Sequence, residues 1–260
     1  MLKELGELHR GAARYALLCP LLFMVPVVAE FVQHVGEVRV GMYESFAAAE
    51  AVAAHPLRMG LGFMKTISLL LATYWVLRFF GIGPGAAMGA DRRAVRLFAP
   101  VFAWSLAWGA AGLWGGNLLG ALGVPDAALT RIGVTVFLVM FLFELTLSPW
   151  KAATAVGDGR IGFLRSVRLA HGDWWWALGF TLLAVLPPMI VHYAFGLGAI
   201  GRSEGVVWIM LALDSLFVGY LAAVLAGTNF IIARRMLARA GLRLEPVAGG
   251  APQASRAATA

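Results

Sequence analysis

The stretch LFAPVFAWSLAWGAAGLWGGNLLGALGVP, residues 97–125, runs for 29 residues without a charged side chain. A second stretch, WWWALGFTLLAVLPPMIVHYAFGLGAIG at residues 174–201, does the same for 28 residues. A helix needs about 20 apolar residues to cross the hydrocarbon core of a bilayer. Both stretches exceed that length, so the sequence predicts an integral membrane protein.

The composition agrees with this class of protein. Hydrophobic residues make up 60% of the chain and charged residues 13%, which is typical of a multi-span membrane protein. The single cysteine, Cys19, excludes an intrachain disulfide and a CxxC-type metal or redox site. The net charge of +7 does not indicate nucleic-acid binding, because the basic residues lie in short turns between apolar segments.

We expect an all-α fold: a six-helix transmembrane bundle over residues 1–244, with a disordered cytoplasmic tail at 245–260. With both termini in the cytoplasm, 16 of the 21 Lys and Arg residues lie inside and 4 outside, which is a strong positive-inside signal. The spans are predicted near residues 15–35, 59–81, 97–121, 132–150, 175–199 and 206–230.

Two further segments are expected to be helical without crossing the membrane. Residues 43–55 are rich in alanine and predict a short helix on the outer face. Residues 161–171 place apolar side chains among Arg165, Arg168 and His171, which suits a helix lying in the cytoplasmic interface.

Glycines and prolines mark special points in the spans. Gly112, Gly116 and Gly120 follow one another at four-residue spacing, so they predict close helix packing, either inside the bundle or across a homodimer. Pro187 and Pro188 remove two backbone donors and are expected to kink or break the fifth span.

Ionisable side chains inside the spans are the best candidates for a functional site, because each is costly in a membrane unless it is paired or hydrated. Glu30, Lys65 and Asp214 are expected at one level in the outer part of the membrane, and they could form a polar cavity, a proton relay or a structural ion pair from Lys65 to Glu30 or Asp214. Glu144 lies deeper. The full set of candidates is Glu30, Lys65, Glu144, His192, Asp214 and Tyr220.

No catalytic motif and no metal-ligand spacing is found in the sequence, so we expect no enzymatic activity, no cofactor and no bound metal. Arginines on the predicted cytoplasmic side are candidates for contact with anionic phospholipid headgroups, or they only fix the orientation of the protein. They are Arg92, Arg93, Arg96, Arg165, Arg168, Arg234 and Arg235.

The stretch LSPWKAATAVGDGRIGFLRSVRLAHGDWW at residues 147–175 resembles a feature of small bacterial six-span proteins. In these proteins a span ends near a proline, and a Gly-containing turn, a Ser-bearing amphipathic helix and a Trp that starts the next span follow. They are the YciC-like proteins and the membrane domain attached to some glycerophosphodiester phosphodiesterases. The ending NFIIARR at residues 229–235 is similar in kind. The resemblance implies a fold and a location but no hydrolase activity.

The function expected from the sequence is therefore non-enzymatic: a multi-pass protein of the bacterial inner membrane that serves in envelope or lipid organisation, as an accessory to a membrane-protein partner. The alternative is a small transporter with a polar site around Lys65 and Asp214.

Overall fold

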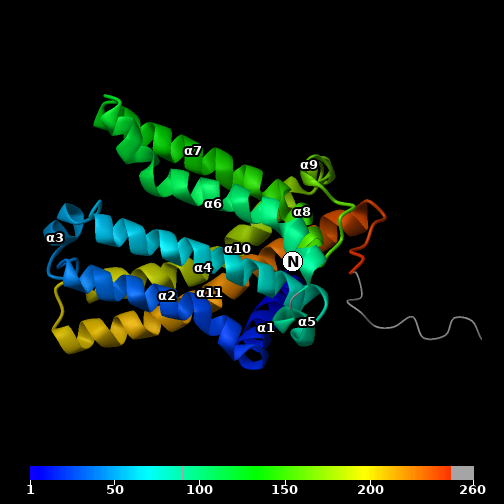
Figure 1. Ribbon diagram of the computed structural model, residues 1–260, viewed down its shortest axis with the longest axis horizontal. Coiled ribbons are helices and arrows are strands. Elements are labelled where there is room, and N and C mark those ends of the chain that lie inside the picture. The colour runs from blue at the N-terminus through cyan, green and yellow to red at the C-terminus, as the bar shows by residue number, and fades with distance from the viewer. Residues whose placement is uncertain (90, 247–260) are drawn as a thin grey trace, which may run out of the picture.

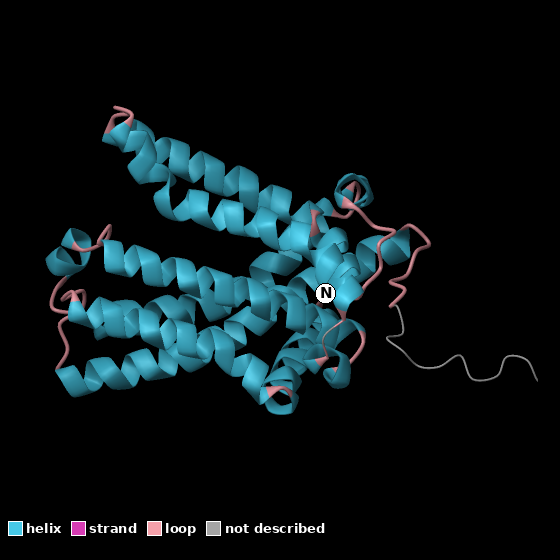
Figure 2. Cartoon of the chain, viewed as in Figure 1, coloured by secondary structure: helices cyan, strands magenta, loops and turns pink. Residues whose placement is uncertain are grey.

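The computed structural model describes residues 1–89 and 91–246, and within these residues all regular structure is helical (Figures 1 and 2). Six helices are long and apolar enough to cross a membrane, which confirms the predicted class of fold. They are α2 (Pro20–Arg39), α4 (Pro56–Gly81), α6 (Arg92–Ala121), α7 (Asp126–Thr146), α10 (Trp174–Ala199) and α11 (Glu204–Arg239).

The first predicted span, 15–35, starts too early. Residues up to Leu18 belong to a separate helix, α1 (Leu2–Leu18), and the spanning helix α2 begins at Pro20. Proline suits the first position of a helix, because the N–H that it lacks has no intrahelical partner there. Pro20 therefore separates the two helices, whereas Pro26 lies inside α2 without ending it.

Helix α1 packs at the end of the bundle that also holds the last turn of α11. Leu8 is fully buried, and an added Cβ at Gly227 of α11 would lie 2.6 Å from its Cδ1 atom. Arg234 of α11 donates to the Glu7 carboxylate of α1 at 2.7 Å. The hydrogen bond from Arg234 lowers the pKa of Glu7. The two helices are thus joined by an apolar contact and an ion pair.

The fourth predicted span, 132–150, ends too late. Helix α7 ends at Thr146, and a second short helix, α8 (Ser148–Ala155), follows with all of its residues buried. Ser166 of α9 (Phe163–Ala170) bridges the break: its hydroxyl donates to the Thr146 carbonyl at 2.7 Å and accepts from the Trp150 N–H at 3.0 Å. Backbone groups at helix ends need such partners.

The remaining expectations have mixed outcomes. Helix α10 continues through Pro187 and Pro188 rather than ending there. Residues 43–55 contain only the short helix α3 (Phe46–Ala51), and α5 (Pro84–Met88) is a further short helix. The amphipathic segment 161–171 forms α9, as predicted. The predicted disordered tail, 245–260, lies outside the described residues from 247 onward.

Helix α11 is the centre of the bundle and contacts α10, α2, α4, α8 and α1. Helices α6 and α7 form a hairpin that packs on α4 and α8 near one end and leads away from the other helices toward the opposite end (Figure 1). We refer to the two ends of the bundle as the α3 end and the α9 end, after the short helices that lie there (Figure 1).

Candidate functional site

The part of α2 nearer the α3 end carries four polar side chains on one face. Glu30, Gln33, His34 and Glu37 follow at spacings of three and four residues, which places them on one side of a helix. All four are buried against the neighbouring helices. An apolar helix therefore presents a polar stripe to the inside of the bundle.

His34 is the centre of this polar cluster. Its Nε2 atom lies 3.1 Å from Asp214 Oδ2 of α11 and 3.4 Å from Glu30 Oε1. Its Nδ1 atom lies 3.0 Å from Glu37 Oε2. Both ring nitrogens thus face carboxylate oxygens, and His34 connects α2 to α11.

Three further contacts extend the cluster to α4 and α10. Lys65 Nζ lies 2.9 Å from Glu30 Oε2, and Arg58 Nε lies 3.2 Å from Glu37 Oε1. His192 Nδ1 lies 2.8 Å from Asp214 Oδ1. Of the two partners that the sequence left open for Lys65, the structure gives it Glu30.

Tyr43 closes the cluster beyond the end of α2. Its hydroxyl donates to Glu37 Oε2 at 2.8 Å. Burial and the adjacent Glu37 carboxylate both raise the pKa of Tyr43, so this phenol stays a neutral donor. The complete cluster comprises Glu30, Gln33, His34, Glu37, Tyr43, Arg58, Lys65, His192 and Asp214.

The charges of the cluster do not balance if both imidazoles are neutral. Three carboxylates, those of Glu30, Glu37 and Asp214, face two permanent cations, Lys65 and Arg58. One negative charge is left over, and an uncompensated charge in a low-dielectric interior is strongly unfavourable. The cluster becomes neutral when it takes up one more positive charge, as a proton on a histidine or on a carboxylate, or as part of the charge of a metal ion.

The other two intramembrane candidates lie elsewhere. Glu144 accepts from Trp104 Nε1 at 2.8 Å and forms an ion pair with Lys151 of α8. Tyr220 contacts α1, where its hydroxyl lies 2.7 Å from His9 Nδ1. Neither residue belongs to the polar cluster.

A lateral cavity of about 680 Å³ lies between α4, α6, α7 and α8, and we call it the lateral groove. The Glu144–Lys151 ion pair lines it together with apolar and small residues. Gly112, Gly115 and Gly116 face open space, because an added Cβ at any of them would meet no atom within 4 Å. The close helix approach in α6 is instead at Gly109, where a Cβ would lie 2.7 Å from Thr66 Cγ2. Two of the three glycines of the predicted stripe thus form a groove wall.

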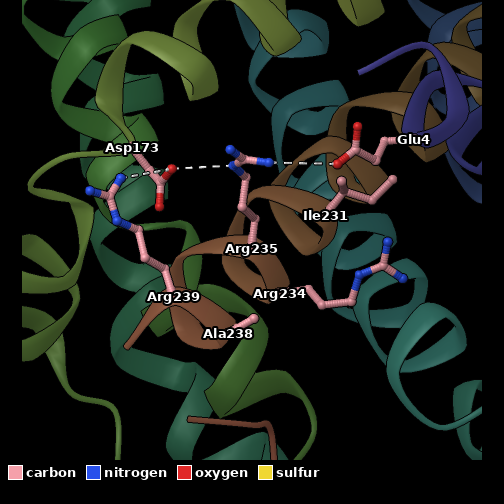
Figure 3. Close-up of a pocket in the computed structure, with 7 residues that line it drawn as sticks. All are labelled: Glu4, Asp173, Ile231, Arg234, Arg235, Ala238 and Arg239. Atoms are coloured by element: carbon pink, nitrogen blue, oxygen red, sulfur yellow. Dashed lines mark hydrogen bonds and ion pairs between the residues drawn. The ribbon is translucent and has the colours of Figure 1, made fainter. Parts of the chain in front are cut away.

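A second cavity, of about 480 Å³, lies at the α9 end and contains three arginines of α11 (Figure 3). Asp173 lies 3.2 Å from Arg235 Nε and 3.3 Å from Arg239 Nη1. Arg235 also lies 3.8 Å from Glu4, and Arg234 pairs with Glu7. Each of the three arginines thus has an acidic partner.

The remaining arginines of the predicted lipid contact are exposed at the same end of the bundle. They lie in the first turns of α6 and along α9, and they are Arg92, Arg93, Arg96, Arg165 and Arg168.

Sequence reasoning identified Glu30, Lys65, His192 and Asp214 but missed the other half of the cluster. It did not consider Gln33, His34 and Glu37, although Gln33 and His34 fall inside the predicted first span at 15–35. Their spacing with Glu30 is the signal that could have shown them on one inward face.

Comparison of the chain with family models, with curated proteins and with solved structures gives no match. The resemblance to YciC-like proteins stays a prediction.

Proposed function

We propose that this chain is a non-enzymatic, multi-pass protein of a bacterial inner membrane, with both termini in the cytoplasm. In this proposal it binds bilayer lipid in the lateral groove and serves in lipid or envelope organisation. The observation that carries the proposal is the groove itself. It is a cavity of about 680 Å³ whose walls come mostly from α4, α6 and α7, three helices long enough to span the membrane.

The lining of the groove suits a hydrocarbon chain. Trp108, Ile132, Val136 and Phe137 supply apolar walls. Inside a bilayer, lipid rather than water fills a cavity along such apolar walls, because water gains no polar partner from them. The groove accordingly fits an acyl chain of a membrane lipid.

A second copy of the chain is a poorer fit for the groove. Gly112 and Gly116 line the cavity together with residues of α4 and α7 rather than an outer face of the bundle, so a helix of a second copy would have to enter the groove to reach them.

The exposed arginines support the proposed orientation and a preference for anionic phospholipid. The α9 end carries Arg92, Arg93 and Arg96 of α6 together with Arg165 and Arg168 of α9. Cationic side chains near a cytoplasmic leaflet attract anionic headgroups with about 1 kcal/mol each. The α9 end would then face the cytoplasm, in line with the positive-inside rule.

The experiment is native mass spectrometry of the protein extracted directly into polymer nanodiscs, with bound lipids identified. Gly116→Phe places a ring in the groove without meeting a neighbouring atom at its Cβ, so we expect it to displace the retained lipid. Gly196→Phe is the matched control: Gly196 of α10 also faces open space but lies outside the groove. Equal lipid retention in both variants, or a dimer that Gly116→Phe dissociates, would contradict the proposal.

The second candidate function is a small transporter, and the buried polar cluster favours it. The test uses Lys65→Cys in a Cys19→Ala background, probed with a membrane-impermeant thiol reagent from each side. Transport by alternating access predicts labelling from both sides, whereas labelling from one side only contradicts it.

A further inference from the structure

We infer that Glu30, His34 and Asp214 form an intramembrane binding site for one divalent transition-metal ion. The inference is independent of the lateral groove. One nitrogen from His34 and one oxygen from each carboxylate all lie within 4.8 Å of one another, and all three side chains are buried.

The spacing of the three atoms suits metal coordination. Zinc binds imidazole nitrogen and carboxylate oxygen at about 2.0–2.2 Å, so neighbouring ligands of a tetrahedral ion lie roughly 3.4 Å apart. The distances from His34 Nε2 are 3.4 Å to Glu30 Oε1 and 3.1 Å to Asp214 Oδ2. Two of the three distances between the ligand atoms are thus already close to those of a tetrahedral zinc site.

The surrounding groups hold the ligands as metal sites require. The Glu37 carboxylate accepts from His34 Nδ1, so Nε2, which lies between Glu30 and Asp214, is the ring nitrogen left to bind a metal ion in place of its hydrogen. His192 hydrogen-bonds the second oxygen of Asp214. Such outer contacts fix the imidazole tautomer and orient the ligating carboxylate.

The charge balance points to a divalent ion and gives Lys65 a role as its competitor. Lys65 neutralises Glu30 in this structure, and its side chain is 21% exposed, so it can extend toward solvent. With Lys65 withdrawn, the three carboxylates, Arg58 and one divalent cation sum to zero charge. The mixed nitrogen and oxygen ligands favour a transition metal such as Zn²⁺ over Mg²⁺ or Ca²⁺, which prefer oxygen alone.

Motif-based reasoning could not find this site, because its ligands come from two helices, with His34 and Asp214 lying 180 positions apart in the chain. The expectation of no bound metal rested on local spacing alone.

The experiment uses the full chain without a polyhistidine tag, in nanodiscs, after removal of metal with a chelator. Equilibrium dialysis against Zn²⁺ measures stoichiometry, and Co²⁺ titration reports the ligand field by visible absorption. We expect one ion per chain. Glu37→Gln leaves all three ligands in place and should weaken binding about 10–100-fold. Glu144→Gln, which removes an intramembrane carboxylate outside the cluster, should leave binding unchanged.

The variant Lys65→Met distinguishes between two interpretations of the cluster, a metal site and a purely structural ion pair. A metal site predicts that this variant binds Zn²⁺ about tenfold tighter or more, because a competing charge is removed, and that Zn²⁺ restores its thermal stability. A purely structural cluster predicts a destabilised variant that Zn²⁺ does not rescue. The inference is overturned by that result, by the lack of saturable binding in the wild type, or by equal binding in wild type and Glu37→Gln.

Discussion

Replacing Ser166 with alanine should uncouple α9 from the break between α7 and α8. The Ser166 hydroxyl donates to the Thr146 carbonyl and accepts from the Trp150 N–H, and Ser166 itself is fully buried. Alanine removes both bonds and leaves two backbone groups without a partner at the ends of two helices.

The size of the effect follows from the two stranded groups. Each buried polar group left unpaired costs about 1–3 kcal/mol. We therefore expect Ser166→Ala to lower the free energy of unfolding by about 2–6 kcal/mol. This exceeds the roughly 0.6 kcal/mol average for side-chain hydrogen bonds between membrane helices, because a helix end offers its backbone groups no alternative partner.

The assay is reversible unfolding in mixed micelles with increasing denaturing detergent, followed by circular dichroism. Ser203→Ala is the matched control, since Ser203 is exposed and its side chain makes no capping hydrogen bond to α11. It should change stability by less than about 0.5 kcal/mol. If Ser166→Ala has an equally small effect, the hydroxyl does not hold the break, and the reasoning is refuted.

Three further predictions follow from the packing and charges. Gly109→Ala should destabilise the protein by about 1–3 kcal/mol, because the new Cβ would lie 2.7 Å from Thr66 Cγ2. Gly112 faces open space, so Gly112→Ala should leave the stability unchanged. Thermal unfolding of the two variants checks this difference. With metal chelated, Lys65→Met should lower the free energy of unfolding by about 3 kcal/mol, because it leaves the Glu30 carboxylate unpaired. Adding Glu30→Gln should restore at least half of that loss. A double-mutant cycle measures the coupling, and additive losses would contradict the pairing. Burial opposes ionisation of Asp158, but hydrogen bonds from Arg160 and from the Glu245 N–H lower the pKa of Asp158 below its ordinary value of 3.8. Its stabilising contribution is therefore complete above pH 3.8 and is lost as the pH falls through the lowered pKa; Asp158→Asn should abolish this part of the acid transition in a pH titration of stability, and an unchanged transition would contradict the assignment.

The sequence was sufficient for the class of fold because apolar length is a direct consequence of bilayer thickness. It was insufficient at the first and fourth spans, where the apolar run continues across a helix break. Pro20 begins α2, and the bend after Thr146 depends on Ser166, which lies in a different helix. A hydropathy pattern contains no information about such a distant hydrogen bond.

The same distinction applies to the polar cluster. Charge inside a span identified Glu30, Lys65 and Asp214, and helix rise placed them at a similar depth. The identity of the partners depends on helix rotation and packing, which bring Lys65 to Glu30 and His34 to Asp214. For the glycines of α6, the sequence predicted a contact that is absent. Four-residue spacing predicted a helix contact at Gly112 and Gly116, but the α6–α7 hairpin diverges from α4 there.

The docking of α1 on α11 has a consequence for biosynthesis. Glu7 and its partner Arg234 are separated by 227 positions in the chain. At about 5–20 residues per second of translation, Arg234 is made roughly 11–45 s after Glu7. During that interval α4 can already cover part of the apolar face of α1, because Tyr15 packs on Phe79, but Leu8 and Glu7 still lack their partners on α11. The ion pair between Glu7 and Arg234 therefore forms only after α11 has been made and has come to lie against α1.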